Sequence, residues 1–589
     1  MCSSCRPPAL ALLLALSLAP MACGGGEPPR SAILVTLDTT RWDALSAHGV
    51  HPGVTPNLDA LAAEGVLYEF AHTVAPITLP AHASMLTGLY PPRHTVRDNG
   101  FQPLPAAAVT LAEAAQAEGI QTAAFVASTV LDQAFGLDQG FATFSAPPRR
   151  TQQTTTHFVE RTGTAVVLDA LEWLGARDRA RPFFLWVHLF DPHEPYTPPP
   201  KFLKVTEKNR TYYGEVAYID EAVGILVDAL RKDGTLAEAT MIVVSDHGES
   251  LFEHQEATHS HFCYESTLKV PLLIRYPDGS PAGERSAEVV SVVDVYPTLL
   301  EAMGLSVASA LDGVSLFHRA VPAGRGAYFE AYTGFIAFGW SPLAGWLDAK
   351  GKYIHSSAPE FYDLAADPDE TKNVLPEGRI DLRPYRAALA AIGSESPLAT
   401  DRAAGIAADV LEAIQGLGYA AAGPLPAPIP PPLQDTGLPS PASMVGTYRT
   451  CQQALALVEA GRLEEARSAF QKVLVENPRN WLALERLGLC YVNLQKPDEA
   501  IPLLRRVVAE GPQRAGTYYN LGICLFSVGQ RDRNVPPVKE GIDALRQAVR
   551  LDTAEPIFLR DLAAMLRATG QTAEADECDR RLAALPGAR

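Results

Sequence analysis

Short, uninterrupted runs of apolar residues recur through the first half of the chain and are separated by helical patterns. The runs occupy residues 32–38, 182–190, 240–246 and 270–276, and Ala- and Leu-rich amphipathic segments such as LDALAAEG and VTLAEAAQAEG lie between them. Continuous apolar runs of this length are typical of strands that are covered on both faces. The pattern therefore predicts an α/β sandwich around a mostly parallel sheet.

Two of the predicted strands end in aspartate. Asp38 closes the first run, and Asp246 closes the third and is followed directly by His247. Ligand sites in open α/β sheets form at the carboxyl ends of strands. Carboxylates and imidazoles are suitable ligands for divalent ions, so these three residues predict a shared metal site.

A threonine at a predicted helix start adds to this picture. In APITLPAHASMLTG, Thr78 stands two residues before Pro80, and proline suits the first turn of a helix. A hydroxyl group at a helix N-terminus lies beside free backbone N–H groups and the positive end of the helix dipole. Contact with a metal ion activates such a hydroxyl group at neutral pH. Thr78 is therefore predicted to be both the nucleophile and a metal ligand.

The C-terminal part of the chain contains a helical repeat with a period of 34 residues. Gly488 and Gly522 stand one period apart, as do Cys490 and Cys524. The segment NWLALERLGLCYVNLQKPDEAIPLLRRVVAEGP resembles a tetratricopeptide repeat. We expect the two cysteines to be buried as small packing residues. Such repeats imply a protein or peptide partner, although they equally suit dimerisation.

The boundaries of the predicted domains follow from these patterns. A catalytic domain is expected at residues 31–420, and an all-α repeat domain at residues 446–589. Between them, residues 421–445 form a Pro-rich segment, which is expected to be an extended, semi-rigid linker. A chain of 589 residues is long enough for several separate cores.

The overall charge and the cysteine pattern exclude some functions. The formal net charge is −18, which argues against general nucleic-acid binding because little positive charge is available for phosphates. The eight cysteines are scattered without a paired metal-binding motif, so neither a zinc ribbon nor a disulfide framework is indicated.

The first residues read as an export signal. A basic residue precedes an apolar run that is too short to span a bilayer, so residues 1–23 are expected to be a signal peptide. Cys23 lies in the sequence MACGGG, which resembles a bacterial lipoprotein cleavage site. We expect a periplasmic or cell-envelope protein with a lipid at Cys23, the alternative being an ordinary secretory signal.

Several ordered motifs resemble the sulfatase family of the alkaline phosphatase superfamily. They lie within residues 31–380 and read VTLDTTRWDALSAHG, TLPAHASMLTGLYPPRH, FFLWVHLFDPHEPY, VVSDHGESLFEH and FYDLAADPDETKN. The resemblance implies an alkaline-phosphatase-like α/β/α sandwich and metal-dependent hydrolysis of esters. Zinc is the first expectation for the metal, with manganese or calcium as alternatives.

The chain departs from the sulfatase pattern at the nucleophile. Sulfatases carry Cys-x-Pro-x-Arg, in which the cysteine is oxidised to formylglycine, whereas this chain has Thr78 and His82 at those two places. Thr-x-Pro-x-His resembles the nucleotide pyrophosphatase and phosphodiesterase branch, which implies that Asn99 binds a phosphoryl oxygen. Phosphoethanolamine and phosphoglycerol transferases also use a threonine, and they place a histidine about where His259 stands. Thr39 replaces the second of two tandem metal-binding aspartates.

The resemblance assigns further roles with some alternatives open. His193 and His259 either bind the ester and its leaving oxygen or complete a second metal site with Asp191. Arg41 either contacts the substrate or pairs with a carboxylate. His82 is expected to support the nucleophile loop rather than to transfer a proton.

Three functions remain possible at this stage. The first is an exported hydrolase that cleaves phosphate esters and diesters, or sulfate esters, through a covalent threonine adduct. The second is a transferase that moves a phospho-group onto envelope glycans or lipids. The third is a non-enzymatic protein that binds partners through its repeats.

Overall fold

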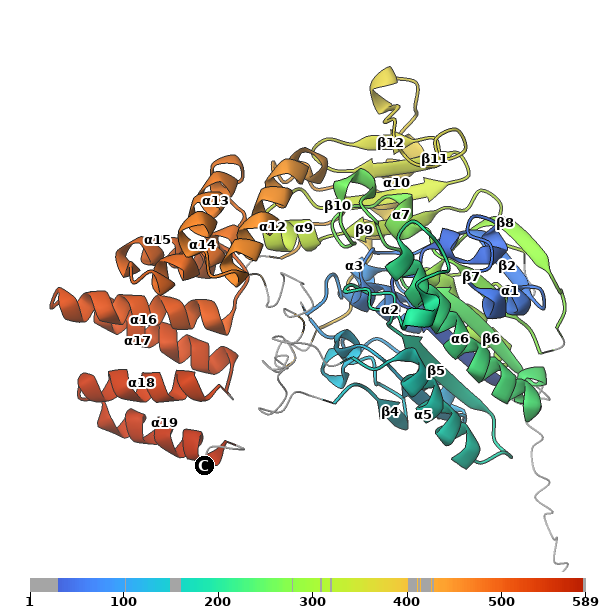
Figure 1. Ribbon diagram of the computed structural model, residues 1–589, viewed down its shortest axis with the longest axis horizontal. Helices are drawn as coiled ribbons and strands as arrows, with labels where there is room; N and C mark the ends of the chain where they lie inside the picture. Colours follow the sequence, from blue (N-terminus) through green and yellow to red (C-terminus); the bar gives the residue numbers. More distant parts are fainter. Residues whose placement is uncertain are drawn as a thin grey trace, which may run out of the picture.

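A computed structural model gives the fold. It describes residues 30–100, 102–148, 160–277, 279–307, 310–317, 320–400, 410, 414, 425, 428–553 and 555–585. The predicted signal peptide and Cys23 lie outside these residues. Among the described helices, none has the length and apolar character that crossing a membrane requires. Figure 1 shows a large sheet between helices, a smaller sheet beside it and a helical array at the C-terminal end.

The central sheet of the described chain has eight strands, and most of them are parallel. Its order is β4 (Thr143–Ser145), β3 (Gln121–Phe125), β5 (Phe183–Leu189), β1 (Ser31–Leu37), β6 (Ala239–Ser245), β7 (Leu272–Arg275), β2 (Val66–His72) and β8 (Glu284–Ser291). Only β7 runs antiparallel to its two neighbours, β6 and β2, within this described sheet. The predicted parallel sheet is therefore confirmed.

Helices cover both faces of this sheet, which explains the continuous apolar runs. Residues at even positions of β1 pack with helices α2 (Thr78–Thr87), α4 (Leu111–Ala117) and α8 (Val295–Ala302) on one face. Residues at odd positions pack with α1 (Pro56–Ala62), α5 (Gly163–Ala176) and α6 (Arg210–Lys232) on the other face. Successive side chains of a strand alternate between faces, so a strand buried on both sides has few polar positions.

A second, antiparallel sheet follows, which the apolar pattern did not reveal. Its order is β12 (Glu360–Tyr362), β11 (Gly351–His355), β10 (Leu343–Asp348) and β9 (Ala327–Ala331), with α7 (Glu265–Leu268), α9 (Thr333–Phe338) and α10 (Arg383–Ser394) nearby. The strands are short, and polar residues interrupt their apolar positions, so the sequence carries only a weak strand signal there.

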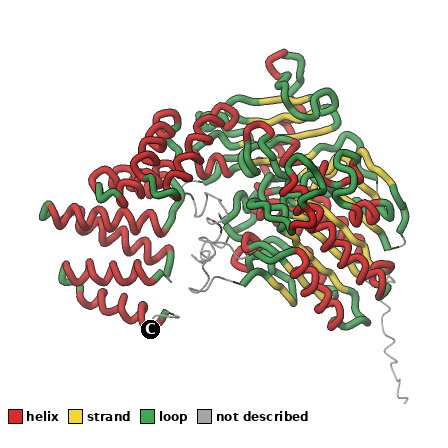
Figure 2. The backbone as a smooth tube through the Cα atoms, viewed as in Figure 1, coloured by secondary structure: helices red, strands yellow, loops and turns green. Residues whose placement is uncertain are grey.

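The C-terminal region is entirely helical, as Figure 2 shows. Its described helices form antiparallel pairs: α12 (Val445–Glu459), α13 (Leu463–Glu476), α14 (Trp481–Asn493), α15 (Pro497–Glu510), α16 (Ala515–Arg531), α17 (Val535–Leu551), α18 (Pro556–Ala568) and α19 (Thr572–Ala584). A Cβ atom at Gly488 would lie 2.8 Å from Leu504, so the repeated glycine allows close helix packing. Cys490 and Cys524 are buried and unpaired, as predicted.

The Pro-rich segment packs against the catalytic domain instead of separating the two domains. The hydroxyl group of Tyr332 donates to the carbonyl of Pro430 at 2.9 Å, and the backbone N–H of Ser341 donates to Pro439 at 2.8 Å. Leu433 packs against the main core. An extended Pro-rich backbone makes no internal hydrogen bonds, so its carbonyl groups accept bonds from a neighbouring surface. The described part of the predicted linker therefore lies on the catalytic domain.

A buried charge network joins the two sheets. The ammonium group of Lys352 on β11 lies 3.1 Å from Glu265 and 2.5 Å from Glu370. Glu265 in turn lies 3.0 Å from His72, at the end of β2 in the main sheet. Lys352 is completely buried, so both carboxylates depend on its charge.

Replacing this lysine is expected to destabilise the catalytic domain strongly. Lys352→Met removes the ammonium group that lies between two buried carboxylates, and we expect the free energy of unfolding to fall by about 3–5 kcal/mol. Urea-induced unfolding followed by intrinsic fluorescence measures the change. Lys372→Met is the matched control, because Lys372 pairs with Glu377 on the exposed surface and its loss should leave the midpoint unchanged. Equal effects of the two substitutions would contradict the role of the network.

Candidate active site

The strand register brings the two predicted aspartates together. Strands β1 and β6 are parallel neighbours, and Leu37 lies opposite Ser245. Asp38 and Asp246 therefore leave the sheet side by side at its carboxyl edge. Thr39 has a left-handed backbone (φ 50°), and its N–H donates to Oδ1 of Asp246 at 3.2 Å. This turn holds the first strand end against the second.

Each aspartate has one engaged and one unpartnered carboxylate oxygen. Oδ2 of Asp38 accepts from Nε2 of His188 at 3.2 Å, and Oδ1 of Asp246 accepts from the backbone N–H of His247 at 2.8 Å. Oδ1 of Asp38 and Oδ2 of Asp246 are buried without a hydrogen-bond partner. Burial raises the pKa of both carboxyl groups; Glu249 adds to this effect at Asp38, and Asp38 adds to it at Asp246. Such a pair requires a cation or a shared proton.

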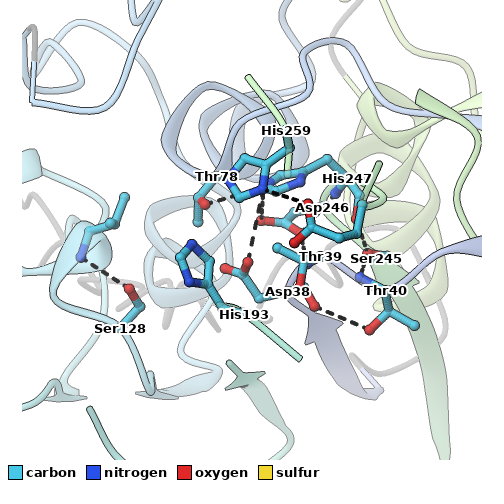
Figure 3. Close-up of polar contacts among 12 residues, drawn as sticks. Asp38, Thr39, Thr40, Thr78, Ser128, His193, Ser245, Asp246, His247 and His259 are labelled. Carbon is cyan, nitrogen blue, oxygen red and sulfur yellow. Dashed lines mark hydrogen bonds and ion pairs between the residues drawn. The ribbon is translucent and has the colours of Figure 1, made fainter. Parts of the chain in front are cut away.

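His247 supplies a nitrogen atom to the same point. Its Nδ1 donates to the carbonyl of Gly248 at 2.9 Å, which leaves the lone pair on Nε2. Nε2 lies 3.6 Å from Oδ2 of Asp246, 4.0 Å from Oδ1 of Asp38 and 3.3 Å from Oγ1 of Thr78 (Figure 3). The ligand atoms of the two aspartates and the histidine all lie within 4.8 Å of one another. Two orphaned carboxylate oxygens and a histidine lone pair fit a divalent metal ion.

Thr78 lies at the start of helix α2, as the sequence predicted. The helix runs over Thr78–Thr87 and is buried throughout. Asn99 fastens its first turn, because its Oδ1 accepts the N–H of Leu79 at 2.9 Å. The amide nitrogen of Asn99 is buried and has no hydrogen-bond partner. The site therefore combines a hydroxyl group, a helix N-terminus and one unused buried donor.

His82 supports the backbone at Thr78. Its Nδ1 donates to the carbonyl of Thr78 at 2.8 Å, and its Nε2 accepts from the hydroxyl group of Thr36 at 3.1 Å. Trp186 donates to that hydroxyl group at 2.9 Å. Burial, with a smaller contribution from His188, lowers the pKa of His82 well below its usual value, so the ring is neutral.

A second cluster of possible ligands, formed by His82, His188 and Asp246, is not suited to an ion. Both ring nitrogens of His82 are already engaged. His188 accepts from the N–H of Ala127 at Nδ1, so its Nε2 carries the proton that it donates to Asp38. These two rings orient Thr78 and Asp38, and neither ring has a lone pair left to bind an ion.

His193 and His259 lie beside the cluster (Figure 3). The ring centroids of these two histidines are 5.3 Å apart, and the ring of His259 lies 4.4 Å from that of His247. Nδ1 of His193 donates to the carbonyl of Glu194 at 2.8 Å, and Nδ1 of His259 donates to Glu249 at 3.2 Å. Burial lowers the pKa of His193 to about 3 and that of His259 to about 4, so both are neutral at physiological pH.

Two predicted residues are engaged elsewhere. Oδ2 of Asp191 accepts the N–H of Gly163 at the start of α5, and Asp191 belongs to neither described ligand cluster. Its role as a ligand of a second ion stays a prediction that this geometry does not support. The guanidinium group of Arg41 makes two 2.8 Å bonds with Asp43 and lies 3.0 Å from Glu253, so the geometry favours the carboxylate-pairing alternative over substrate contact.

Sequence reasoning missed His188 and Glu249. His188 is the single strongly polar residue in FFLWVHLF, and it pairs in register with Thr36, two residues before Asp38. A polar side chain in a strand buried on both faces was the available signal. Glu249 follows His247 by two residues, is completely buried and accepts the hydroxyl group of Tyr196 at 3.0 Å. Its burial could not be read from a loop sequence.

Comparisons with known proteins agree with this geometry. Residues 30–305 match the Sulfatase family, and residues 254–382 match the C-terminal part of N-sulphoglucosamine sulphohydrolase. Residues 451–515 match the tetratricopeptide repeat. Enzymes of the Sulfatase family are metal-dependent, in keeping with the ligand cluster formed by the two strand ends.

Two curated relatives and one solved structure illustrate this similarity. Arylsulfatase K of Xenopus laevis is 25% identical over 447 residues, which cover 62% of this chain and 81% of that protein. Choline-sulfatase of Rhizobium meliloti is 26% identical over 55% of this chain and 79% of its own length. The crystal structure of phosphonate monoester hydrolase of Agrobacterium radiobacter has the same fold, with a TM-score of 0.51, 24% identity and coverage of 62% of this chain and 94% of that one.

These similarities span both halves of the molecule and coincide with the motifs that built the site. The chain therefore contains a Sulfatase family domain followed by tetratricopeptide repeats, and these similarities support ester hydrolase activity.

Proposed function

We propose that this protein is an exported, metal-dependent hydrolase that cleaves phosphate esters, diesters included, through Thr78 as the nucleophile. One observation carries the proposal. The unpartnered oxygens of Asp38 and Asp246 converge with Nε2 of His247 beside the Thr78 hydroxyl group, at the N-terminus of a buried helix. This is the arrangement that a hydroxyl nucleophile needs at neutral pH.

The metal ion would be held by Asp38, Asp246 and His247, with Thr78 beside it. When bound, it would lower the pKa of the hydroxyl group and withdraw charge from the ester oxygens. One nitrogen and two carboxylate ligands suit zinc first, with manganese or calcium as alternatives. His188 keeps the Asp38 carboxylate oriented toward this position through its 3.2 Å hydrogen bond.

The protein residues perform the remaining steps. Oγ1 of Thr78 forms a bond to phosphorus, the bond to the ester oxygen breaks, and the proton that the threonine hydroxyl group loses is taken up by the leaving alcohol. Water then attacks the phosphorylated threonine and releases phosphate or a phosphomonoester, which restores the hydroxyl group. The buried amide of Asn99 and the positive end of the α2 helix dipole stabilise the developing negative charge on the equatorial oxygens. His82 holds the carbonyl of Thr78 and thereby the attack angle.

His193 and His259 complete the substrate side of the proposed site. Both rings are neutral and lie next to His247, so they suit hydrogen bonding to the ester or its leaving oxygen. Glu249 fixes the ring of His259 through Nδ1. This support from a second residue keeps the ring orientation constant during turnover.

Sulfate esters are the second candidate substrate, and the relatives favour them. The curated relatives described above are named arylsulfatase and choline-sulfatase. Threonine at position 78 favours phosphate instead, because a secondary hydroxyl group is not the substrate of formylglycine formation in the family that this chain resembles. Small-molecule, glycan or lipid esters remain the substrate range.

Export and partner binding complete the proposal. The sequence of residues 1–23 supports secretion to the periplasm or cell envelope, with lipid attachment at Cys23 as the only membrane contact. The repeat domain supports binding of a protein or peptide.

Loss of the nucleophile should abolish turnover. Thr78→Ala is expected to reduce kcat/KM by at least about a thousandfold, because the attacking atom is removed. The assay compares bis-p-nitrophenyl phosphate, p-nitrophenyl phosphate and p-nitrophenyl sulfate with the full chain and added zinc. Thr87→Ala is the control, since Thr87 lies in the same helix and donates only to the carbonyl of Ala83. Retained activity in Thr78→Ala would exclude threonine as the nucleophile. Turnover of p-nitrophenyl sulfate alone would change the proposed substrate class from phosphate esters to sulfate esters.

Removal of a carboxylate should abolish metal binding. Asp246→Asn is expected to weaken zinc affinity by more than about 100-fold, measured by elemental analysis after dialysis against zinc buffers. In EDTA the same variant should unfold at a higher temperature than the wild type, because two buried carboxylates no longer face each other.

Asp191→Asn provides the matched control for this measurement. Because Asp191 caps α5, we expect its replacement to leave the zinc content unchanged. A lower zinc content in Asp191→Asn would restore the two-ion alternative. An unchanged zinc content in Asp246→Asn would contradict the site itself.

A further inference from the structure

The repeat domain and the catalytic domain share one apolar core. The cluster contains Ala337, Phe338 and Trp340 from α9 and the residues after it, together with Tyr448 and Leu482 of the repeat helices. Figure 1 shows α12 and α14 beside α9. A Cβ atom at Gly339 would lie 2.3 Å from the carbonyl of Arg479, so the two backbones touch there. The repeats are thus fastened directly to the catalytic domain.

This contact holds one end of a strained active-site loop. We define the active-site loop as residues 249–261; it begins with Glu249 and contains His259. Four of its non-glycine residues have left-handed backbones: Phe252, His254, Gln255 and Ser260, with φ values of 76°, 50°, 65° and 90°. Such conformations are unfavourable for residues that carry a Cβ atom, and they persist only where surrounding contacts enforce them. The loop shape that places His259 therefore depends on its neighbours.

Several of those neighbours come from the repeat domain. The ring of Tyr448 lies 4.8 Å from that of His261, and Phe338 lies 5.3 Å from it. Arg449 donates to the side chain of Gln255. Two successive residues of α12 therefore hold the loop at two points, at Gln255 before His259 and at His261 after it.

A second route leads from the repeats to Asn99. The side chain of Asn477 donates to the carbonyl of Phe338 at the end of α9, at 2.6 Å. At the start of α9, the hydroxyl group of Thr333 donates to Oδ1 of Asp98 at 2.9 Å. That same oxygen accepts the N–H of Asn99 at 3.0 Å. Helix α9 has six residues, about one and a half turns, so a displacement of its C-terminal end also displaces its N-terminal end.

We propose that the first repeats are a structural part of the catalytic unit and that Tyr448 and Asn477 are positioning residues for His259 and Asn99. The two routes begin on neighbouring repeat helices and end at two residues on the substrate side of the site. A domain that served only to recruit partners would have no need to contact the segments that carry His259 and Asn99. The inference rests on the proposed function for the roles of His259 and Asn99, but the contacts themselves do not.

The test combines kinetics with hydrogen exchange on the full, zinc-loaded chain. Tyr448→Ala removes the ring that packs on His261, whereas Tyr448→Phe keeps it and loses only the hydroxyl contact with Gln452. Asn477→Ala removes the bond to α9. Leu562→Ala is the control, because Leu562 is buried in a core made only of later repeat residues. The readouts are kcat and KM for whichever ester the wild type cleaves, and the exchange rates of peptides covering residues 97–99 and 249–261.

We expect Tyr448→Ala to lower kcat about tenfold with little change in KM and to speed exchange in residues 249–261, because a misplaced His259 affects the reacting geometry. Asn477→Ala should speed exchange in residues 97–99. Tyr448→Phe should behave as the wild type, and Leu562→Ala should lower thermal stability without changing kcat or exchange in either loop.

Two results would overturn the inference. One is wild-type kcat and loop exchange in Tyr448→Ala, and the other is an equal loss of kcat in Leu562→Ala. An active Thr78→Ala in the same assay would reject the proposed nucleophile alone. In that case the exchange rates would still decide whether the repeats hold the two loops.

Discussion

The structure depends on a pair of carboxylates that the parallel sheet forces together. Asp38 and Asp246 end adjacent strands in register, and each keeps one buried oxygen without a partner. Two such charges repel each other in a dry interior, so the folded state requires a cation between them or a proton on one of them. The repulsion between the two carboxylates favours a cation at this position, and a cation held there would also lie beside Thr78. Stability and chemistry are therefore linked through one interaction.

The surrounding histidines divide into two groups according to their hydrogen bonds. His82 and His188 use both ring nitrogens to orient the backbone of Thr78 and the carboxylate of Asp38. His247 donates from Nδ1 to a backbone carbonyl and keeps its lone pair toward the carboxylates. Burial keeps these rings neutral, since charging them would cost desolvation energy. Histidines that look equivalent in the sequence therefore have different roles, which depend on the hydrogen-bond partners of their ring nitrogens.

The domain arrangement differs from that of two modules on a spacer. The Pro-rich segment lies on the catalytic domain, and α12 and α14 share an apolar core with the segment around α9. A shared core makes relative motion costly, whereas a solvated linker would permit it. A partner bound at the later repeats would therefore contact a body that is already continuous with the active-site loop.

The sequence alone determined the parallel sheet, the helical repeat, and the residues Asp38, Thr78, Asp246 and His247, because strand periodicity, a 34-residue period and strand-end polarity are local signals. Only the tertiary structure decided which histidines face the carboxylates. His188 was hidden in an apolar strand, Glu249 was hidden in a loop, and Asp191 accepts a backbone N–H at the start of α5. The small antiparallel sheet and the docking of the repeats were equally hidden. These features arise from contacts between residues distant in sequence, which no local pattern encodes.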